Sequence, residues 1–137
     1  MSIESEFADI PGGNKIVEWF GRVPSFHDAN ILELTIRNGR ESCLRIHAWN
    51  MTNEVDQNGF FVLEKHAVVT ISAHHVTSVQ FDDFDTSAII FDLTIRKDGD
   101  QYTISWCSSY GVSGSLKAKK LSMDLQPGEP VGSHASG

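Results

Sequence analysis

The chain has 137 residues, a formal net charge of −7 and 40% hydrophobic residues. This length suits one domain with one core, and this composition is typical of a folded domain rather than a disordered, fibrous or low-complexity one. Acidic residues outnumber basic ones by 18 to 11, which disfavours direct binding to nucleic acid because an acidic surface repels phosphates.

The sequence also predicts the cellular compartment of the protein. The first eleven residues contain three acidic side chains and no basic region followed by an apolar stretch, so they do not resemble a secretory signal. Apolar runs are only a few residues long, far short of the roughly 20 that span a bilayer. We therefore expect a cytoplasmic protein without membrane contact, in which Cys43 and Cys107 are reduced thiols.

One short helix is expected first, at residues 14–21. Its apolar side chains recur at helical spacing, and these are Ile16, Val17, Trp19 and Phe20. Asn14 is a candidate N-cap, and Gly21 is a candidate C-terminal stop. Pro24 then prevents the helix from continuing.

From residue 31 onward the apolar residues alternate with polar ones, which is the pattern of half-buried strands. In the first strand Leu32, Leu34 and Ile36 are predicted to face the core. About seven strands are predicted, at 31–37, 43–49, 60–72, 76–81, 89–96, 102–106 and 115–125.

Turn residues separate these strands. Asn38-Gly39 and residues 97–100 each predict a hairpin, and the polar stretches 50–59 and 108–114 predict loops. Lys65 interrupts an otherwise regular alternation, which predicts a bulge or bend nearby.

Because no helix separates the strands, we expect a mainly β protein: an antiparallel β-sandwich or partly closed barrel with one short N-terminal helix. Residues 1–126 are predicted to form this single domain. Residues 127–137 are mostly small and polar, and they are predicted to be a flexible C-terminal tail.

Six histidines raise the hypothesis of a metal site. Adjacent His74 and His75 would point to opposite faces of a strand, and the chain has no H-x-H or C-x-x-C pair. We therefore expect no metal and no cofactor. His27 and Asp28 are interpreted as a polar clamp between the helix and the first strand. A metal-dependent binder or enzyme that uses these two residues remains the alternative.

Motifs for other enzyme chemistry are missing as well. The chain contains no G-x-S-x-G elbow and no phosphate-binding loop, and neither cysteine lies among basic residues that would activate it. We therefore expect a protein that is not an enzyme. Lys117, Lys119 and Lys120 form the one basic cluster, which we interpret as protection of a sheet edge.

The acidic turn Asp82, Asp83 and Asp85 is the predicted partner-binding site. Three carboxylates within four residues focus negative potential and could steer a basic partner toward the protein.

Three segments resemble the bacterial immunity protein 50 family. Residues 21–29, GRVPSFHDA, resemble its G-x-x-P-S-F-H-D-A stretch, residues 79–84 its alternating apolar and acidic segment, and residues 109–114 its S-Y-G-x-S-G stretch. The first motif supplies the predicted structural positions Gly21, Pro24, Phe26, His27 and Asp28. The resemblance spans roughly residues 19 to 125.

This resemblance implies an all-β protein that neutralises a cognate polymorphic toxin by stoichiometric binding, without catalytic residues. A structural module that self-associates through a sheet edge, for example as a homodimer, is left open as a further alternative.

Overall fold

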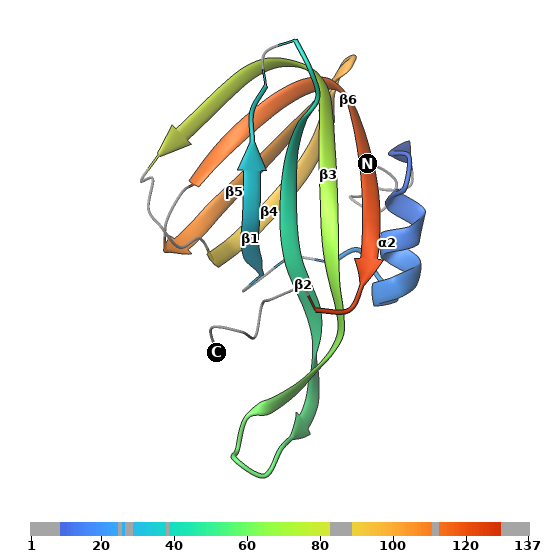
Figure 1. The fold of residues 1–137 in the computed structure, drawn as a ribbon, viewed down its shortest axis with the longest axis vertical. Coiled ribbons are helices and arrows are strands. Elements are labelled where there is room, and N and C mark those ends of the chain that lie inside the picture. Colours follow the sequence, from blue (N-terminus) through green and yellow to red (C-terminus); the bar gives the residue numbers. More distant parts are fainter. Residues whose placement is uncertain are drawn as a thin grey trace.

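A computed structural model of the chain describes residues 9–24, 26, 29–37, 39–82, 89–110 and 113–129. The protein is mainly β, as the sequence predicts, and the strands follow helix α2 (Figure 1). The elements are α2 (Gly13–Phe20), β1 (Asn30–Thr35), β2 (Ser42–Val55), β3 (Phe61–Asp82), β4 (Ile89–Asp98), β5 (Gln101–Tyr110) and β6 (Ser113–Pro127).

All strand pairs are antiparallel, and the strand order is β1-β2-β3-β6-β5-β4. The two outer strands meet through one residue pair, Asn30 with Ile89, so the sheet curls into a barrel with a minimal seam. β1, β2 and the first half of β3 form the front layer in Figure 1, and β4 and β5 lie behind them. This arrangement agrees with the predicted partly closed barrel.

β3 belongs to both layers, and this is where the strand count differs from the prediction. The two strands predicted at 60–72 and 76–81 are one strand of 22 residues. At His75 the backbone adopts a φ of 58°, and the register with β6 shifts between Val76 and Ser78. Such a bulge bends a strand without ending it. The described residues therefore contain six strands rather than about seven.

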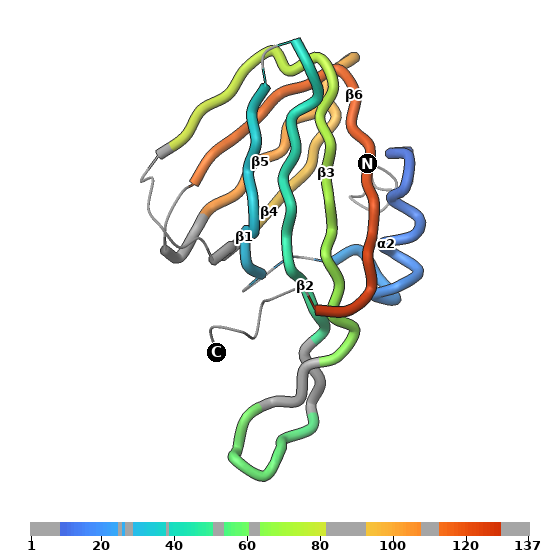
Figure 2. Tube along the Cα trace, viewed as in Figure 1, coloured from blue at the N-terminus to red at the C-terminus, as the bar shows by residue number. Residues whose placement is uncertain are grey.

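The bulge predicted near Lys65 is confirmed. Lys65 has a φ of 58°, and the register between β2 and β3 changes from Ala48 opposite Ala67 to Asn50 opposite Glu64. One extra residue on β3 is thereby accommodated at the lower end of the barrel, where the two strands leave it together (Figure 2).

The core lies between the two layers and is lined by alternate residues of the strands. The alternation of apolar and polar residues predicts one inward face for each strand, and this is confirmed in the later strands, where these apolar residues are buried: Leu44, Ile46, Ala48, Ala67, Val69, Ile71, Leu93, Ile95, Ile104, Trp106, Leu121 and Met123. The side chains of Ile89 and Phe91, predicted on the same face of β4, lie outside the described residues.

The predicted face of the first strand is wrong in part. Leu32 is 39% exposed and Ile36 is 41% exposed, whereas Ile31 and Leu34 pack against the core. The register between β1 and β2 shifts between Ile31 and Glu33, so the alternation skips one residue there.

Helix α2 begins and ends close to the predicted positions. Its N-cap is Gly12 rather than Asn14, and its C-cap is the predicted Gly21, whose amide donates to the carbonyl of Val17 at 2.8 Å. Ile16 and Phe20 are buried and join the barrel core.

The segment before α2 covers an edge of β6. β5 pairs with residues 114–118 of β6 only, so the second half of β6 has no strand partner on that side among the described residues. The amide of Met123 instead donates to the carbonyl of Pro11 at 2.7 Å. Covering an edge in this way satisfies its backbone and blocks pairing with other chains.

Two predicted loops are shorter than expected. β2 continues to Val55 and β3 begins at Phe61, so the turn predicted at 50–59 is confined to residues 56–60. β5 continues to Tyr110 and β6 begins at Ser113. Long paired strands override the local preference of polar residues for loops.

The chain stays paired with the barrel beyond residue 127, where the flexible tail is predicted to begin. β6 runs through Pro127, and the amide of Gly128 donates to the carbonyl of His66 at 2.7 Å. The rest of the predicted tail, residues 130–137, lies outside the described residues. Among the helices described, none is long and apolar enough to cross a membrane.

Gly12 provides a test of how tightly this edge is packed. A Cβ atom built at Gly12 would lie 1.7 Å from the carbonyl oxygen of Met123, and the φ of Gly12 is 87°. We expect Gly12→Ala to destabilise the protein by about 2 to 5 kcal/mol, because left-handed strain and overpacking add.

Gly39→Ala is the matched control for urea unfolding of the Gly12→Ala variant. Gly39 has a similar φ of 75°, but no atom lies within 4 Å of its built Cβ. The control should therefore lose only about 1 to 2 kcal/mol. Equal losses in the two variants would contradict the close approach of Gly12 to β6.

Candidate functional site

The β2–β3 hairpin extends beyond the barrel as a two-stranded arm (Figures 1 and 2). We call residues 50–64 the hairpin arm. The side chains described at its tip, residues 54–60, are all exposed. They include Val55, 56% exposed, and Phe60, 69% exposed, the two most exposed large hydrophobic residues described. Apolar side chains displayed in this way favour contact with another molecule.

Asp56 fixes the turn at the tip of the arm. Its Oδ1 accepts hydrogen bonds from the amides of Asn58, at 2.8 Å, and Phe60, at 3.0 Å. Its own amide donates to the carbonyl of Phe60 at 2.8 Å, and Gly59 supplies a φ of 86°. Phe60 is therefore exposed on a turn whose backbone hydrogen bonds are satisfied.

The described charges on the arm are acidic. Glu54, Asp56 and Glu64 are exposed, and the neutral polar side chains described near them include Asn50, Gln57 and Asn58. An apolar tip with acidic neighbours is suited to a protein surface that presents apolar and basic groups together.

The base of the arm is held to helix α2 at two points. The indole N–H of Trp19 donates to the carbonyl of Lys65 at 3.0 Å, and the Lys65 ammonium lies 4.5 Å from the centre of the Trp19 ring. The side-chain amide of Asn50 donates to the carbonyl of Phe20 at 3.0 Å. These contacts fix the position from which the arm extends.

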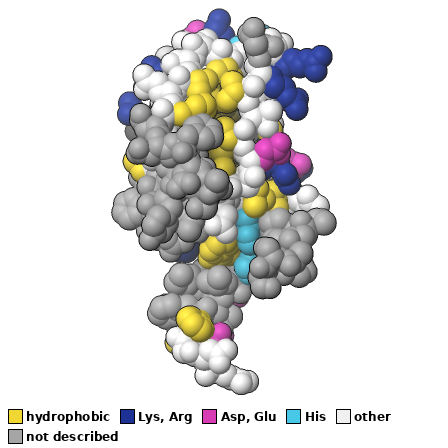
Figure 3. Space-filling model, turned by 60° about the vertical axis from the view of Figure 1, so that its left-hand side comes forward, with side chains coloured by type: hydrophobic (Ala, Val, Ile, Leu, Met, Phe, Trp, Pro, Cys, Tyr) yellow, Lys and Arg dark blue, Asp and Glu magenta, His cyan; other side chains and the backbone are white. Residues whose placement is uncertain are grey.

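A cluster of aromatic rings lies at the same base, on the outer face of β2 and β3. His47 Nε2 is 3.1 Å from His66 Nδ1, and the ring of Trp49 is 4.9 Å from that of His47. Glu129 Oε1 is 3.9 Å from His66 Nε2. Figure 3 shows histidine side chains beside hydrophobic ones on one face of the barrel.

Burial lowers the pKa of His47 below its ordinary value of 6.5, and the nearby ring of His66 lowers it further, while Glu129 acts in the opposite direction. The contact between the two histidines requires one ring nitrogen to donate and the other to accept. It is therefore compatible with one imidazolium but not with two. Among the described residues, no group of three or more metal-ligating side chains is found.

The residues predicted for partner binding are only partly described. Asp82 ends β3, where its backbone pairs with Ser113, and its side chain lies outside the described residues. Asp83 and Asp85 lie outside them entirely, as do His27 and Asp28. The partner site, the polar clamp and the alternative metal-dependent chemistry at His27 and Asp28 stay predictions.

Three other positions of the predicted motif are described. Gly21 caps α2, and Pro24 lines a small cavity beside Trp49. Phe26 is only 3% exposed and has a φ of 60°, and its carbonyl accepts from the amide of Ala29 at 3.0 Å. These residues connect α2 to β1.

The sequence alone predicts neither the hairpin arm nor the aromatic cluster. Val55 and Phe60 belong to a stretch whose polar residues predict a loop. His47 and Trp49 do alternate on one face of β2, but His66 joins them only through the register that places Ala48 opposite Ala67. In the sequence, the alternation of histidine and aromatic residues in β2 is the one pattern that indicates this cluster.

Comparison with known proteins finds no family model, no curated protein and no solved structure that matches this chain.

The lowered pKa of His47 predicts how stability depends on pH. His47 binds a proton more readily in the unfolded chain than in the folded protein. Its contribution to the free energy of unfolding is therefore fully present above pH 6.5. This contribution is lost as the pH falls from 6.5 toward the lowered pKa. We expect His47→Gln to reduce the loss of stability between about pH 7.5 and 5.

NMR titration of the histidine ring protons tests the cause directly. In His66→Gln the pKa of His47 should rise, because the neighbouring charge is removed, and should stay below 6.5, because burial remains. A native His47 that titrates at or above 6.5 would contradict the arrangement.

Proposed function

We propose that this protein neutralises a basic bacterial toxin by stoichiometric binding, with the hairpin arm as the principal contact. The observation that carries the proposal is the arm itself, which displays Phe60 and Val55 among exposed carboxylates on a fixed turn. Catalysis is not part of the proposal.

The physical case rests on what each group contributes to binding. An exposed aromatic side chain on a backbone that is already held in place loses only its side-chain freedom when a partner covers it, and aromatic rings are frequent hot spots of interfaces. The carboxylates of Glu54, Asp56 and Glu64 would accelerate encounter with a basic partner and select against acidic ones. A chain of net charge −7 adds to this attraction.

The resemblance to the immunity protein 50 family supports the same proposal, because it implies inhibition by binding. Its three motifs, at residues 21–29, 79–84 and 109–114, lie outside the arm. The acidic turn Asp82, Asp83 and Asp85 is accordingly proposed as a second contact.

The decisive experiment pairs the protein with the toxin-like product of a neighbouring gene. We expect co-expression to restore growth and the two proteins to co-purify in a fixed ratio. Lack of rescue by the folded native protein would refute inhibition of that toxin.

Substitution of the arm tests the contact. In the purified complex, Val55→Ser and Phe60→Ser should each weaken binding, with Phe60→Ser costing about 2 kcal/mol, or about 30-fold in Kd. Leu32→Ser is the control, because Leu32 is an exposed apolar residue on β1 away from the arm. If all three variants bind equally well, the arm is not the interface.

The contribution of the carboxylates to partner binding is tested with separate variants. The triple variant Glu54→Gln, Asp56→Asn and Glu64→Gln should slow association and flatten its dependence on salt. Asn at position 56 keeps an oxygen that can accept the turn hydrogen bonds. The variant Asp82→Asn, Asp83→Asn and Asp85→Asn reports on the acidic turn in the same assay. If neither variant changes the salt dependence, the partner is not recognised by its basic charge.

A further inference from the structure

A groove of about 700 Å³ lies at the opposite end of the barrel from the arm. It is formed by residues 36, 37 and 39–41 in the connection between β1 and β2, and by residues 74–79 where β3 bends. Figure 1 shows this connection at the top of the barrel and the arm at the bottom. The volume is within the range of small-molecule sites, about 300 to 1,000 Å³.

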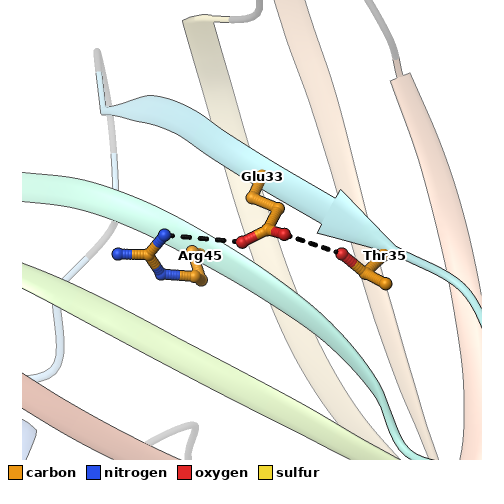
Figure 4. Close-up of polar contacts among 3 residues, drawn as sticks. All are labelled: Glu33, Thr35 and Arg45. Atoms are coloured by element: carbon orange, nitrogen blue, oxygen red, sulfur yellow. Dashed lines mark hydrogen bonds and ion pairs between the residues drawn. The ribbon is translucent and has the colours of Figure 1, made fainter.

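Two guanidinium groups in this groove have no counterion among the described residues. Arg37 and Arg40 are both exposed, and the amide of Arg37 donates to Ser42 Oγ at 3.0 Å, which holds the connection in place. Arg45 on β2 differs, because its guanidinium is 3.4 Å from Glu33, which also accepts from Thr35 (Figure 4). Arg37 and Arg40 are thus available to an anion in a way that Arg45 is not.

Further basic residues come from β6. Lys120 lies opposite His74 and Lys117 lies opposite Ser78, so both are on β6 beside residues of β3 that line the groove, although neither lysine lines it itself. Lys117 also pairs with Thr103 of β5, so β6 is not an edge strand at this position. The interpretation of Lys117 as edge protection is therefore wrong. Figure 3 shows Lys and Arg side chains at the upper end of the molecule.

Among the described lining residues, Glu41 is the one carboxylate. Its Oε2 is 3.9 Å from His74 Nδ1, and the other ring nitrogen of His74 is 3.2 Å from Ser122 Oγ. His75 also lines the groove and is exposed. Arg37 and Arg40 therefore place positive charge in the groove of a protein that is acidic overall, and Lys117 and Lys120 lie on the neighbouring strand.

The groove also has an apolar part. Ile36 is 41% exposed, and Val76 and Val79 line the wall formed by β3. These side chains offer an apolar surface beside the two guanidinium groups. A ligand with both an anionic group and an apolar body would satisfy both parts of the groove.

We propose that this groove binds a small organic phosphate. Arg37 and Arg40 would hold the phosphate by paired hydrogen bonds, with Lys117 and Lys120 adding positive charge, and the organic body would lie on Ile36 and Val79. A dianionic phosphate matches several cations better than a single carboxylate does. The proposal is independent of the proposed inhibition of a toxin, since the arm lies at the other end of the barrel.

The test uses the full chain and three probes in an NMR titration of the backbone amides: phenyl phosphate, phenylacetate and benzyl alcohol. We expect phenyl phosphate to shift amides of residues 36–41 and 74–79, phenylacetate to bind more weakly and benzyl alcohol not to bind. Arg37→Gln with Arg40→Gln should weaken phenyl phosphate binding at least about tenfold.

The control is the double variant Lys15→Gln with Arg22→Gln, which removes the same charge at exposed positions on and just after α2. It should bind phenyl phosphate as the native protein does. Equal weakening in the two double variants, or shifts confined to other residues, would overturn the proposal. Binding of a single-stranded oligonucleotide without binding of phenyl phosphate would overturn it as well, because the groove would then take a polyanion.

Discussion

The conformation of β3 is the constraint on which both ends of the molecule depend. This strand pairs with β2 and β6 and passes from the front layer to the back layer over 22 residues. It does so through two residues with left-handed backbone, Lys65 and His75, each of which costs about 1 to 2 kcal/mol compared with a regular strand. The long ladders on both sides of β3 compensate this cost, and the two bulges then define the hairpin arm and the groove.

Much of the fold could be predicted from the alternation of apolar and polar residues. It identifies the inward faces of β2, β4 and β5, and the stop at Gly21 ends the helix correctly. It fails where a bulge intervenes, because an extra residue reverses the alternation, as at Leu32. Composition also fails at residues 50–59, where polar residues occupy strands whose pairing, rather than intrinsic propensity, keeps them extended.

The candidate sites were harder to predict, because they depend on contacts between distant residues. His47 and His66 are 19 positions apart and meet only in the observed register of β2 and β3. Likewise, Arg40 and Val79 belong to distant segments of the chain and line one groove where β3 bends. Net charge is an average, and it conceals the separation of an acidic arm from a basic groove.

The turn at the tip of the arm forms its backbone hydrogen bonds within residues 56–60, and it makes none to the described part of the barrel. Side chains there can therefore be exchanged without disturbing the core, provided that Asp56 and Gly59 keep the turn. Selection for a new partner and selection for a stable fold would then act on different residues. In such an architecture recognition can diverge quickly between relatives while the barrel changes slowly.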